Sequence, residues 1–210
     1  MEVVEKHTGK EQVELIRRSI SEGMCYNEYR DLVHQLTVHR QTTGMDQLES
    51  LINYTELNDR RMNRWDKTLK VPNEIQEKIS NINSKLTFLA LSESWCGDAA
   101  PSLPVINRIS ELNPNIDFKV LLRDENPELM DEFLTNGARS IPKLIIWDRE
   151  DEKVVAEWGP RPSIATQMVE DFKQEYGSLT SEFKQALQVW YNKDKGQNAL
   201  SDIVALLPLE

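Results

Sequence analysis

The feature that most constrains this chain is an alternation of two apolar periodicities between residues 72 and 176. Short runs rich in branched residues, such as LTFLALS at 86–92 and KLIIWD at 143–148, alternate with segments whose apolar residues recur every three or four positions. A nearly continuous apolar run suits a strand buried on both faces, whereas the longer period is typical of an amphipathic helix. The segment therefore predicts an α/β fold with helices on both faces of a sheet.

The predicted order of elements in this segment is helix, strand, helix, strand, helix, strand, strand, helix. We expect helices from Pro72 and over about 100–112, 127–136 and 162–176, and strands over 86–92, 117–123, 143–148 and 153–158. A helix between two strands implies a parallel pair, and the short connection 149–152 implies an antiparallel hairpin. We expect Asn136-Gly137 to close the helix at 127–136. The sheet is therefore predicted to be mixed.

Both ends of the chain show helical periodicity alone. Before residue 70 it predicts three helices, with a break at Thr42-Thr43-Gly44 and a capping box, Asp46-x-x-Glu49, that opens the third. After residue 178 it predicts two more, separated by the polar run NKDKGQ. We therefore expect a helical extension at 1–70, an α/β domain at 71–177 and a second helical extension at 178–210.

Composition narrows the possible partners. The chain has 25 Lys and Arg against 35 Asp and Glu, a net charge of -10 that works against binding to nucleic acid or to an anionic membrane surface. No window approaches the roughly 18 apolar residues of a membrane span, and the opening MEVVEKHTGKEQVE lacks a basic segment followed by an apolar core. We therefore expect a cytoplasmic protein that binds neither nucleic acid nor membrane.

The residues that usually bind metals are sparse. The histidines at positions 7, 34 and 39 are scattered, and the two cysteines, Cys25 and Cys96, have no zinc-ligand spacing and are too few for a disulfide framework. We expect no metal site. Cys25 precedes a Tyr-rich helical segment, where a half-buried structural cysteine is the preferred interpretation and a distant resolving thiol the alternative.

Cys96 stands where a buried strand runs directly into a helix. Backbone N–H groups point outward at such a position, and the positive end of the helix dipole stabilises a thiolate, which is the nucleophilic form of cysteine. A lone cysteine is more often an inert, buried small hydrophobe. The flanking Trp95 and Gly97 favour the reactive interpretation.

The surroundings of Cys96 resemble the thioredoxin family. Trp95-Cys96-Gly97 matches the start of the family's Trp-Cys-Gly-Pro-Cys site, and Pro104 falls where thioredoxins carry a proline in the active-site helix. Ile141-Pro142, followed by KLIIW, resembles the segment that presents the family's cis-proline, and Gly159 falls where a glycine follows the last strand. The resemblance covers about residues 70–177 and implies a thioredoxin-like three-layer α/β/α sandwich. With Asp98 in the site and helical additions at both ends, the chain is similar to bacterial thioredoxin-family proteins of uncertain role.

The resemblance also implies roles for single residues. The residue that matches Cys96 attacks a substrate disulfide, Trp95 shields it, and Ile141 offers backbone hydrogen bonds to a substrate chain beside a cis Ile141-Pro142 bond. The supporting residues of the expected site are Trp95, Gly97, Asp98, Ala99 and Pro142. No cofactor is implied; the partners would be protein thiols and disulfides, with an external low-molecular-weight thiol or a protein reductant as cosubstrate.

Three departures from the family pattern concern the second thiol. Ala99 stands where the resolving cysteine should be, Ala90 where thioredoxins carry a buried acid, and Val120 where they carry a lysine. With no second thiol to deprotonate, an apolar core at these positions avoids burying unpaired charge. The site is therefore interpreted as one built around a single thiol.

The charge beside the thiol acts in two directions. The Asp98 carboxylate stabilises the first turn of the helix but disfavours a thiolate at Cys96, so the sign of the thiol pKa shift stays open. Arg139, near the proline loop, is either a counter-charge to Asp98 or a solvated loop cation, and we prefer the second.

Three functions fit these residues. The first is a monothiol thiol–disulfide oxidoreductase in which Cys96 attacks and an external thiol resolves the product. The second is a redox-inactive thioredoxin-fold binding or scaffold module, since a fold does not guarantee its usual activity. The third is a single-thiol redox sensor.

Overall fold

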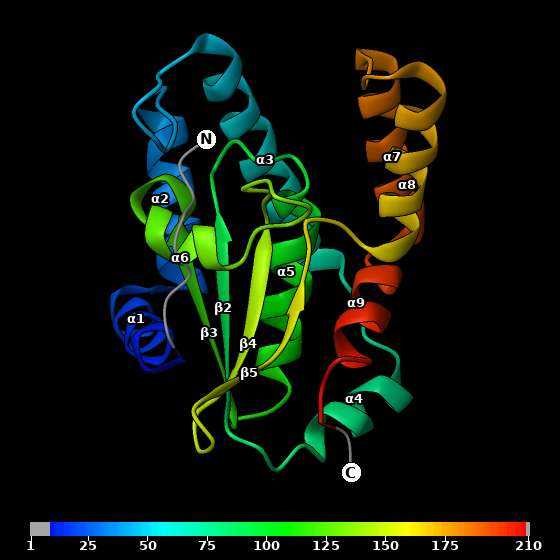
Figure 1. Ribbon diagram of the computed structural model, residues 1–210. Coiled ribbons are helices and arrows are strands. Elements are labelled where there is room, and N and C mark those ends of the chain that lie inside the picture. Colours follow the sequence, from blue (N-terminus) through cyan, green and yellow to red (C-terminus); the bar gives the residue numbers. More distant parts are fainter. Residues whose placement is uncertain (1–8, 209–210) are drawn as a thin grey trace.

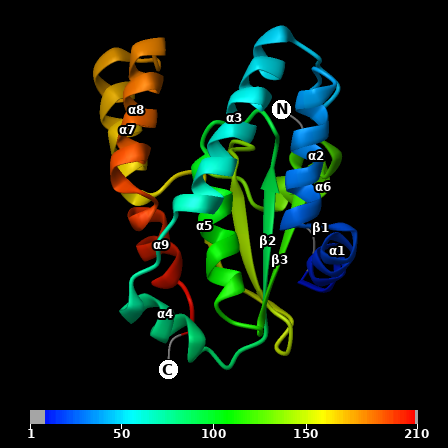
Figure 2. The same ribbon diagram turned by 180° about the vertical axis from the view of Figure 1, so that it is seen from behind.

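The computed structural model describes residues 9–208, so His7 lies outside the described part. Its helices are α1 (Gly9–Glu22), α2 (Tyr26–Val38), α3 (Glu49–Thr68), α4 (Asn73–Ser80), α5 (Ala99–Glu111), α6 (Pro127–Glu132), α7 (Ser163–Tyr176), α8 (Ser181–Asp194) and α9 (Gln197–Val204), with a 3-10 turn at Arg123–Glu125. Its strands are β1 (Met24–Cys25), β2 (Leu86–Ser92), β3 (Ile116–Leu122), β4 (Lys143–Asp148) and β5 (Lys153–Trp158). The strands lie between α5 on one side and α1 and α6 on the other (Figures 1 and 2), which confirms the three-layer prediction.

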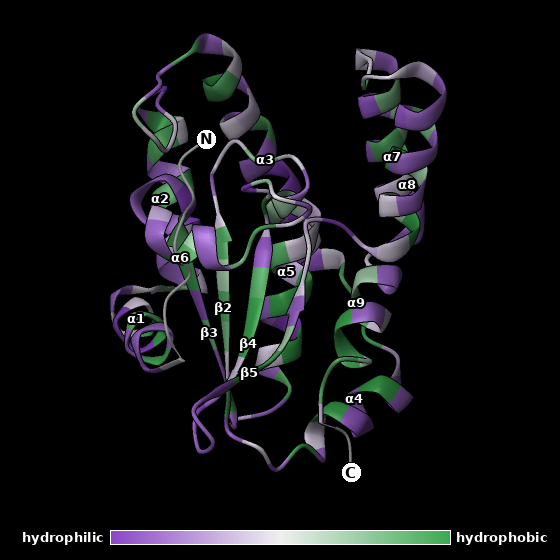
Figure 3. Cartoon of the chain, viewed as in Figure 1, coloured by the Kyte–Doolittle hydropathy of each residue, from purple (hydrophilic) through white to green (hydrophobic). Residues whose placement is uncertain are grey.

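The sheet is mixed, as predicted. Its strand order is β1-β3-β2-β4-β5. Strands β2 and β3 are parallel, β4 runs antiparallel to β2, and β4 and β5 form the antiparallel hairpin. Every residue of β2 is buried, and the central strands carry hydrophobic colours while the helices around them alternate (Figure 3). The apolar run of β2 therefore forms the middle of the core and ends at the residues that lead to Cys96.

The helix predicted at 127–136 is wrong in its second half. Helix α6 ends at Glu132, and Asn136-Gly137 forms the tip of a tight turn closed by pairing between Thr135 and Ala138. Asn136 and Gly137 have φ of 51° and 75°. Two successive left-handed residues are what a two-residue turn needs, and Asn-Gly is the pair that adopts them most readily. The same signal therefore closes a turn instead of a helix.

Two expectations for the first 70 residues are also corrected. Helix α3 begins at Glu49 with Leu48 as its N-cap, so the capping box at Asp46-x-x-Glu49 does not form; the Glu49 carboxylate pairs with Arg40. The segment is not purely helical, because Met24 and Cys25 pair antiparallel with β3 as an edge strand. A strand of two residues is too short to produce a periodic signal.

The C-terminal helices build a second, smaller core. Helices α7 and α8 form a hairpin that extends past the sheet beside α3 (Figure 1). The buried residues of this second core are Trp65 of α3, Ala165 and Val169 of α7, and Leu187 and Tyr191 of α8. This core fixes one face of α8 close to the loop that carries Cys96.

Candidate functional site

Cys96 and the proline loop meet, although they are far apart in sequence. The Cys96 thiol, 6% exposed, donates a hydrogen bond to the carbonyl oxygen of Ile141 at 3.3 Å. The Ile141-Pro142 peptide bond is cis, which confirms that prediction. Cys96 follows the end of β2 and precedes α5, as expected. Strand, helix and loop therefore converge on one sulfur atom.

Gly159 is required where the chain leaves β5. Its φ is +114°, and a Cβ placed on it would lie 2.1 Å from the Pro142 carbonyl oxygen. A side chain at this position is excluded both by backbone conformation and by space. The glycine predicted to follow the last strand therefore allows the chain to pass directly against the cis-proline loop.

The positions that lack the family's second thiol and its partners are apolar and closed. Ala90 of β2 and Val120 of β3 are register partners, and both are fully buried. Ala99, the first residue of α5, is fully buried as well. These side chains belong to one hydrophobic core, so all three positions are apolar.

The thiol of Cys96 is held protonated. Burial, with a smaller contribution from the Asp98 carboxylate, raises the pKa of Cys96 to about 12. The backbone N–H groups of Ala99 and Asp98 and the charge of Arg161 lower this pKa, but they do not outweigh burial. The sequence left the sign of the Cys96 pKa shift open, and in the structure this pKa is raised. The nucleophilic thiolate is therefore a minor form at neutral pH.

Asp98 is the centre of a buried polar cluster. The Arg161 guanidinium lies 2.6 Å from Asp98 Oδ2, and the hydroxyl of Tyr191 donates to Asp98 Oδ1 at 3.1 Å. Burial nevertheless raises the pKa of Asp98. Arg139 is not the counter-charge, because it forms two bonds of 2.6 Å with Asp131.

The sequence interpretation missed Arg161 and Tyr191. Both lie in segments far along the chain from Asp98, one in the loop before α7 and one on α8. Tyr191 follows the apolar positions of a helix, and Arg161 stands between two prolines. Neither context gives a sequence signal for a partner of Asp98.

The N-terminal segment holds the loop before Cys96 through a buried group of hydroxyls. Ser94 Oγ accepts the backbone N–H of Thr43 at 3.0 Å and lies 2.8 Å from Thr55 Oγ1 and 3.1 Å from Thr42 Oγ1. The Asn58 amide of α3 donates to the Ser94 carbonyl oxygen at 2.9 Å. Thr42-Thr43, interpreted from sequence only as a helix break, is therefore part of the support of the site.

Glu93 is a buried acid next to this cluster. It accepts the Asp124 backbone N–H at 2.9 Å with one carboxylate oxygen, while Oε2 is buried without a hydrogen-bond partner. Burial raises the pKa of Glu93. The backbone carbonyl of Glu93 accepts the N–H of Cys96 at 3.1 Å, so this residue also shapes the turn before the thiol.

Cys25 lies in a different part of the fold. It pairs with Lys119 of β3, which in turn is level with Leu89 of β2, whereas Cys96 lies beyond the end of β2. Two strand spacings alone separate β1 from β2 by roughly 9 Å, beyond the Cα separation of about 7 Å that a disulfide tolerates. Both cysteines are free, and in this arrangement Cys25 does not reach Cys96.

A pocket of about 620 Å³ opens onto Cys96. It is bounded by the turn at 95–98, the loops at 139–141 and 160–161, one side of α3 and one side of α8. The Gln188 amide of α8 donates to the Gly97 carbonyl oxygen at 3.3 Å. The half-buried Trp95 ring lies under the Arg123 guanidinium, 5.0 Å from its centroid. Helix α8, predicted only as part of an extension, is therefore a wall of the site.

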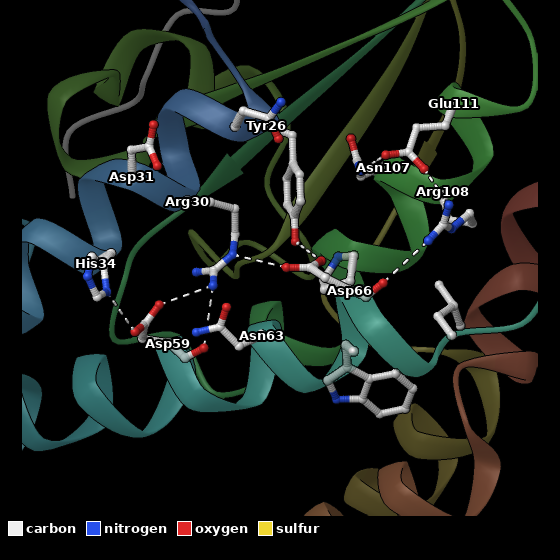
Figure 4. A pocket seen from close by; sticks show the side chains of 14 residues that line it. Tyr26, Arg30, Asp31, His34, Asp59, Asn63, Asp66, Asn107, Arg108 and Glu111 are labelled. Carbon is white, nitrogen blue, oxygen red and sulfur yellow. Dashed lines mark hydrogen bonds and ion pairs between the residues drawn. The ribbon is translucent and has the colours of Figure 1, made fainter.

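A second pocket, of about 440 Å³, lies between α2, α3 and α5, away from the thiol (Figure 4). Arg30 pairs there with Asp59 at 3.1 Å and with Asp66 at 3.2 Å, and the Tyr26 hydroxyl donates to Asp66 at 2.7 Å (Figure 4). The Arg30 guanidinium thus bridges two carboxylates of α3. We interpret the polar contacts that line this pocket as structural, because they connect α2 with α3.

Two further findings concern the described residues as a whole. Within residues 9–208, no group of three or more His, Cys, Asp or Glu side chains is arranged to hold a metal ion. Over the same range, no helix is both long enough and apolar enough to cross a membrane.

The fold, the cis-proline and the position of the thiol define a protein of the thioredoxin-fold class. The chain belongs to the thioredoxin family, whose model matches residues 44–173. That match begins within the N-terminal segment, before α3, and so includes the helix that lines the pocket.

Two solved structures share the fold. The chain is similar to a protein of unknown function from Pseudomonas aeruginosa, with 16% identity and a TM-score of 0.60, over 90% of this chain and 93% of that one. It is also similar to an HIV epitope-scaffold, with 18% identity and a TM-score of 0.53, over 87% of this chain and 97% of that one. No curated protein matches the chain in sequence.

Proposed function

We propose that the protein carries out thiol–disulfide exchange with Cys96 as its single nucleophile, acting on protein disulfides or mixed disulfides. The observation that carries the proposal is the contact of 3.3 Å between the Cys96 thiol and the Ile141 carbonyl, beside cis-Pro142 and at the floor of a pocket. This arrangement supports the proposal because the sulfur, although largely buried, borders a pocket. The two free cysteines also fit a cytoplasmic location, where thiols are kept reduced.

The exchange balances without a cofactor. Cys96 sulfur bonds to one sulfur of a substrate disulfide, the substrate S–S bond breaks, and the leaving thiolate takes up the proton lost by Cys96. A second, external thiol then attacks the mixed disulfide and releases Cys96 as a thiol. With alanine at position 99, no neighbouring thiol competes for that second step.

The raised pKa of the thiol means that exchange requires a change around Cys96. Its burial is the largest cause, and Gln188 and Tyr191 of α8 hold that helix against Gly97 and Asp98. A shift of α8 would admit water and favour the thiolate. A protonated, buried thiol is a poor peroxide sensor, since oxidation follows thiolate character and exposure.

The second candidate function is binding without turnover. It is favoured by one observation, the pKa of about 12 for the Cys96 thiol, which leaves very little thiolate at neutral pH. In that case the pocket would hold a partner while the sulfur stays a thiol.

A direct test uses the Cys25→Ser protein, with the Cys25→Ser/Cys96→Ser protein as control. Reduction of a protein mixed disulfide is followed with 2-mercaptoethanol as the external thiol. Turnover that exceeds the control supports exchange, and rates equal to the control favour the binding function.

A second variant tests whether Cys96 can form a disulfide without the need to know the substrate. Ala99→Cys restores a thiol at the start of α5, and we expect it to form a disulfide with Cys96 under mild oxidation. If that disulfide forms and turnover of the parent is still absent, the site geometry is intact and the exchange proposal fails.

A further inference from the structure

The pocket above Cys96 is electropositive in a chain that is acidic overall. Among its lining residues are five cations, Arg61, Arg123, Arg139, Arg161 and Lys184, against one acid, Asp98. The chain as a whole has a net charge of -10. The concentration of positive charge in one concave, partly apolar site is the kind of field that attracts an anionic ligand.

Three of these cations already have partners. Arg161 pairs with Asp98, Arg139 with Asp131, and Arg123 with Asp124 at 2.8 Å. Lys184 is exposed on α8. The remaining cation of the pocket is Arg61.

Arg61 is half-buried, and among the described residues it has no carboxylate partner. Its Nη1 donates to the neutral Asn58 Oδ1 at 3.2 Å. The same atom lies 4.0 Å from where a Cβ on Gly97 would stand, so the guanidinium faces the turn next to Cys96. Burial, and to a smaller extent Arg64, lowers the pKa of this guanidinium, and the attraction of Tyr54 and Asp98 offsets this only in part. A partly desolvated guanidinium is stabilised by a carboxylate, which it binds in a planar, two-bond geometry.

The rest of the lining suits a small molecule. Leu57 and Tyr54 of α3 and Leu187 of α8 supply apolar surface, and the volume of about 620 Å³ lies within the range of small-ligand sites. Residues of both α3 and α8 line the pocket.

We propose that this pocket binds a small thiol, or its disulfide, that carries a carboxylate. The carboxylate pairs with Arg61 while the sulfur lies at Cys96. This inference rests on the proposed function and names the external thiol or mixed disulfide that it uses.

The exchange arm of the test compares three small disulfides with the Cys25→Ser protein. The probes are dithiodiglycolate, which is anionic, bis(2-hydroxyethyl) disulfide, which is neutral, and cystamine, which is cationic. Mixed-disulfide formation at Cys96 is followed by mass spectrometry, and each rate is divided by the rate with a free cysteine peptide. We expect a preference of about tenfold for the anion over the neutral probe, equivalent to about 1.4 kcal/mol.

The variant Arg61→Gln should abolish this preference, measured as the ratio of the rate with the anionic probe to the rate with the neutral probe. Arg60→Gln is the matched control, because Arg60 is the adjacent, exposed residue of α3 and does not line the pocket. Arg60→Gln changes the net charge of the chain by the same amount as Arg61→Gln. It should nevertheless keep the preference for the anionic probe, because Arg60 lies outside the pocket.

The binding arm does not depend on exchange. Adipate, a dicarboxylate without sulfur, should raise the Tm of the Cys25→Ser and Arg60→Gln proteins but not that of Arg61→Gln. If adipate binds in this way and no disulfide reacts, the anion site stands and the proposed exchange fails. If all three disulfides react equally and adipate has no effect, exchange stands and the anion site is overturned. The proposal of a small-molecule site would also be overturned if only disulfides of acidic peptides, and none of the small probes, reacted at a rate that depends on Arg61.

Discussion

The Arg161 guanidinium lies 2.6 Å from the Asp98 carboxylate, two residues from the thiol of Cys96. The side chains are 23% and 13% exposed, so both charges are largely removed from water. Asp98 raises the pKa of Cys96 and Arg161 lowers it, and the pair thus acts on the thiol in opposite directions. A substitution of either charged residue should therefore change the pKa of the Cys96 thiol.

We predict that Asp98→Asn makes Cys96 more reactive. The change removes the negative charge and leaves that of Arg161 uncompensated, so the pKa of Cys96 should fall from about 12 by about one unit or more. In the Cys25→Ser background, alkylation at pH 8 should accelerate about tenfold. Asp131→Asn is the control, because it removes an equal charge from the Arg139 pair without contacting the thiol. Equal rates for the two variants would contradict this account.

We predict that Gly159→Ala severely destabilises the fold. Its Cβ would stand 2.1 Å from the Pro142 carbonyl oxygen, and φ is +114°. We expect a loss of more than about 3 kcal/mol in the free energy of unfolding, measured with urea. Gly177→Ala isolates the backbone term, because φ is +79° there and nothing lies within 4 Å of the new Cβ. It should cost about 1–2 kcal/mol. Equal costs would show that contact with Pro142 is unimportant.

We predict that Glu93 makes stability fall as pH rises from acid. Burial raises the folded-state pKa of Glu93 above the unfolded value of about 4.3. Between these two values the folded state binds more protons than the unfolded state, so the contribution of Glu93 to stability is largest at low pH and is lost as pH rises through the folded-state pKa.

The measurement is the free energy of unfolding of the parent minus that of Glu93→Gln, followed from about pH 4 to pH 7.5. We expect this difference to decrease as pH rises. The exposed Glu77→Gln change on α4 is the control for replacing one carboxylate by an amide. An increase with pH at Glu93 would refute the prediction.

We predict that Ser94→Ala weakens both the fold and the site. The change leaves the Thr43 N–H and the Thr42 and Thr55 hydroxyls without their shared partner in a buried cluster. We expect a loss of about 1–3 kcal/mol in the free energy of unfolding. Ser80→Ala, at an exposed position of α4, should change stability by less than about 0.5 kcal/mol. If the two serines prove equivalent, the cluster is not what anchors the loop.

Local patterns determined much of the fold. The apolar run of β2 and the helical periods of α5 and α7 predicted the layers, because strand and helix differ in the spacing of buried residues. The cis Ile141-Pro142 bond followed from resemblance and is found where expected. The Cys96 thiol contacts the Ile141 carbonyl oxygen beside it. Short or ambiguous signals failed: β1 has too few residues to show a period, and Asn136-Gly137 suits a turn as well as a helix end.

Tertiary structure alone decided the electrostatics of the site. The sequence near Cys96 contains the acid, Asp98, but its partners Arg161 and Tyr191 arrive from distant segments, and so does Arg61 in the pocket wall. The pKa of a thiol depends on burial and on charges within a few ångströms, and chain neighbours supply only part of either. The sequence could therefore place a single thiol at the end of a strand, while only the packing of α3, α8 and two loops around it determined that the thiol is protonated beneath an electropositive pocket.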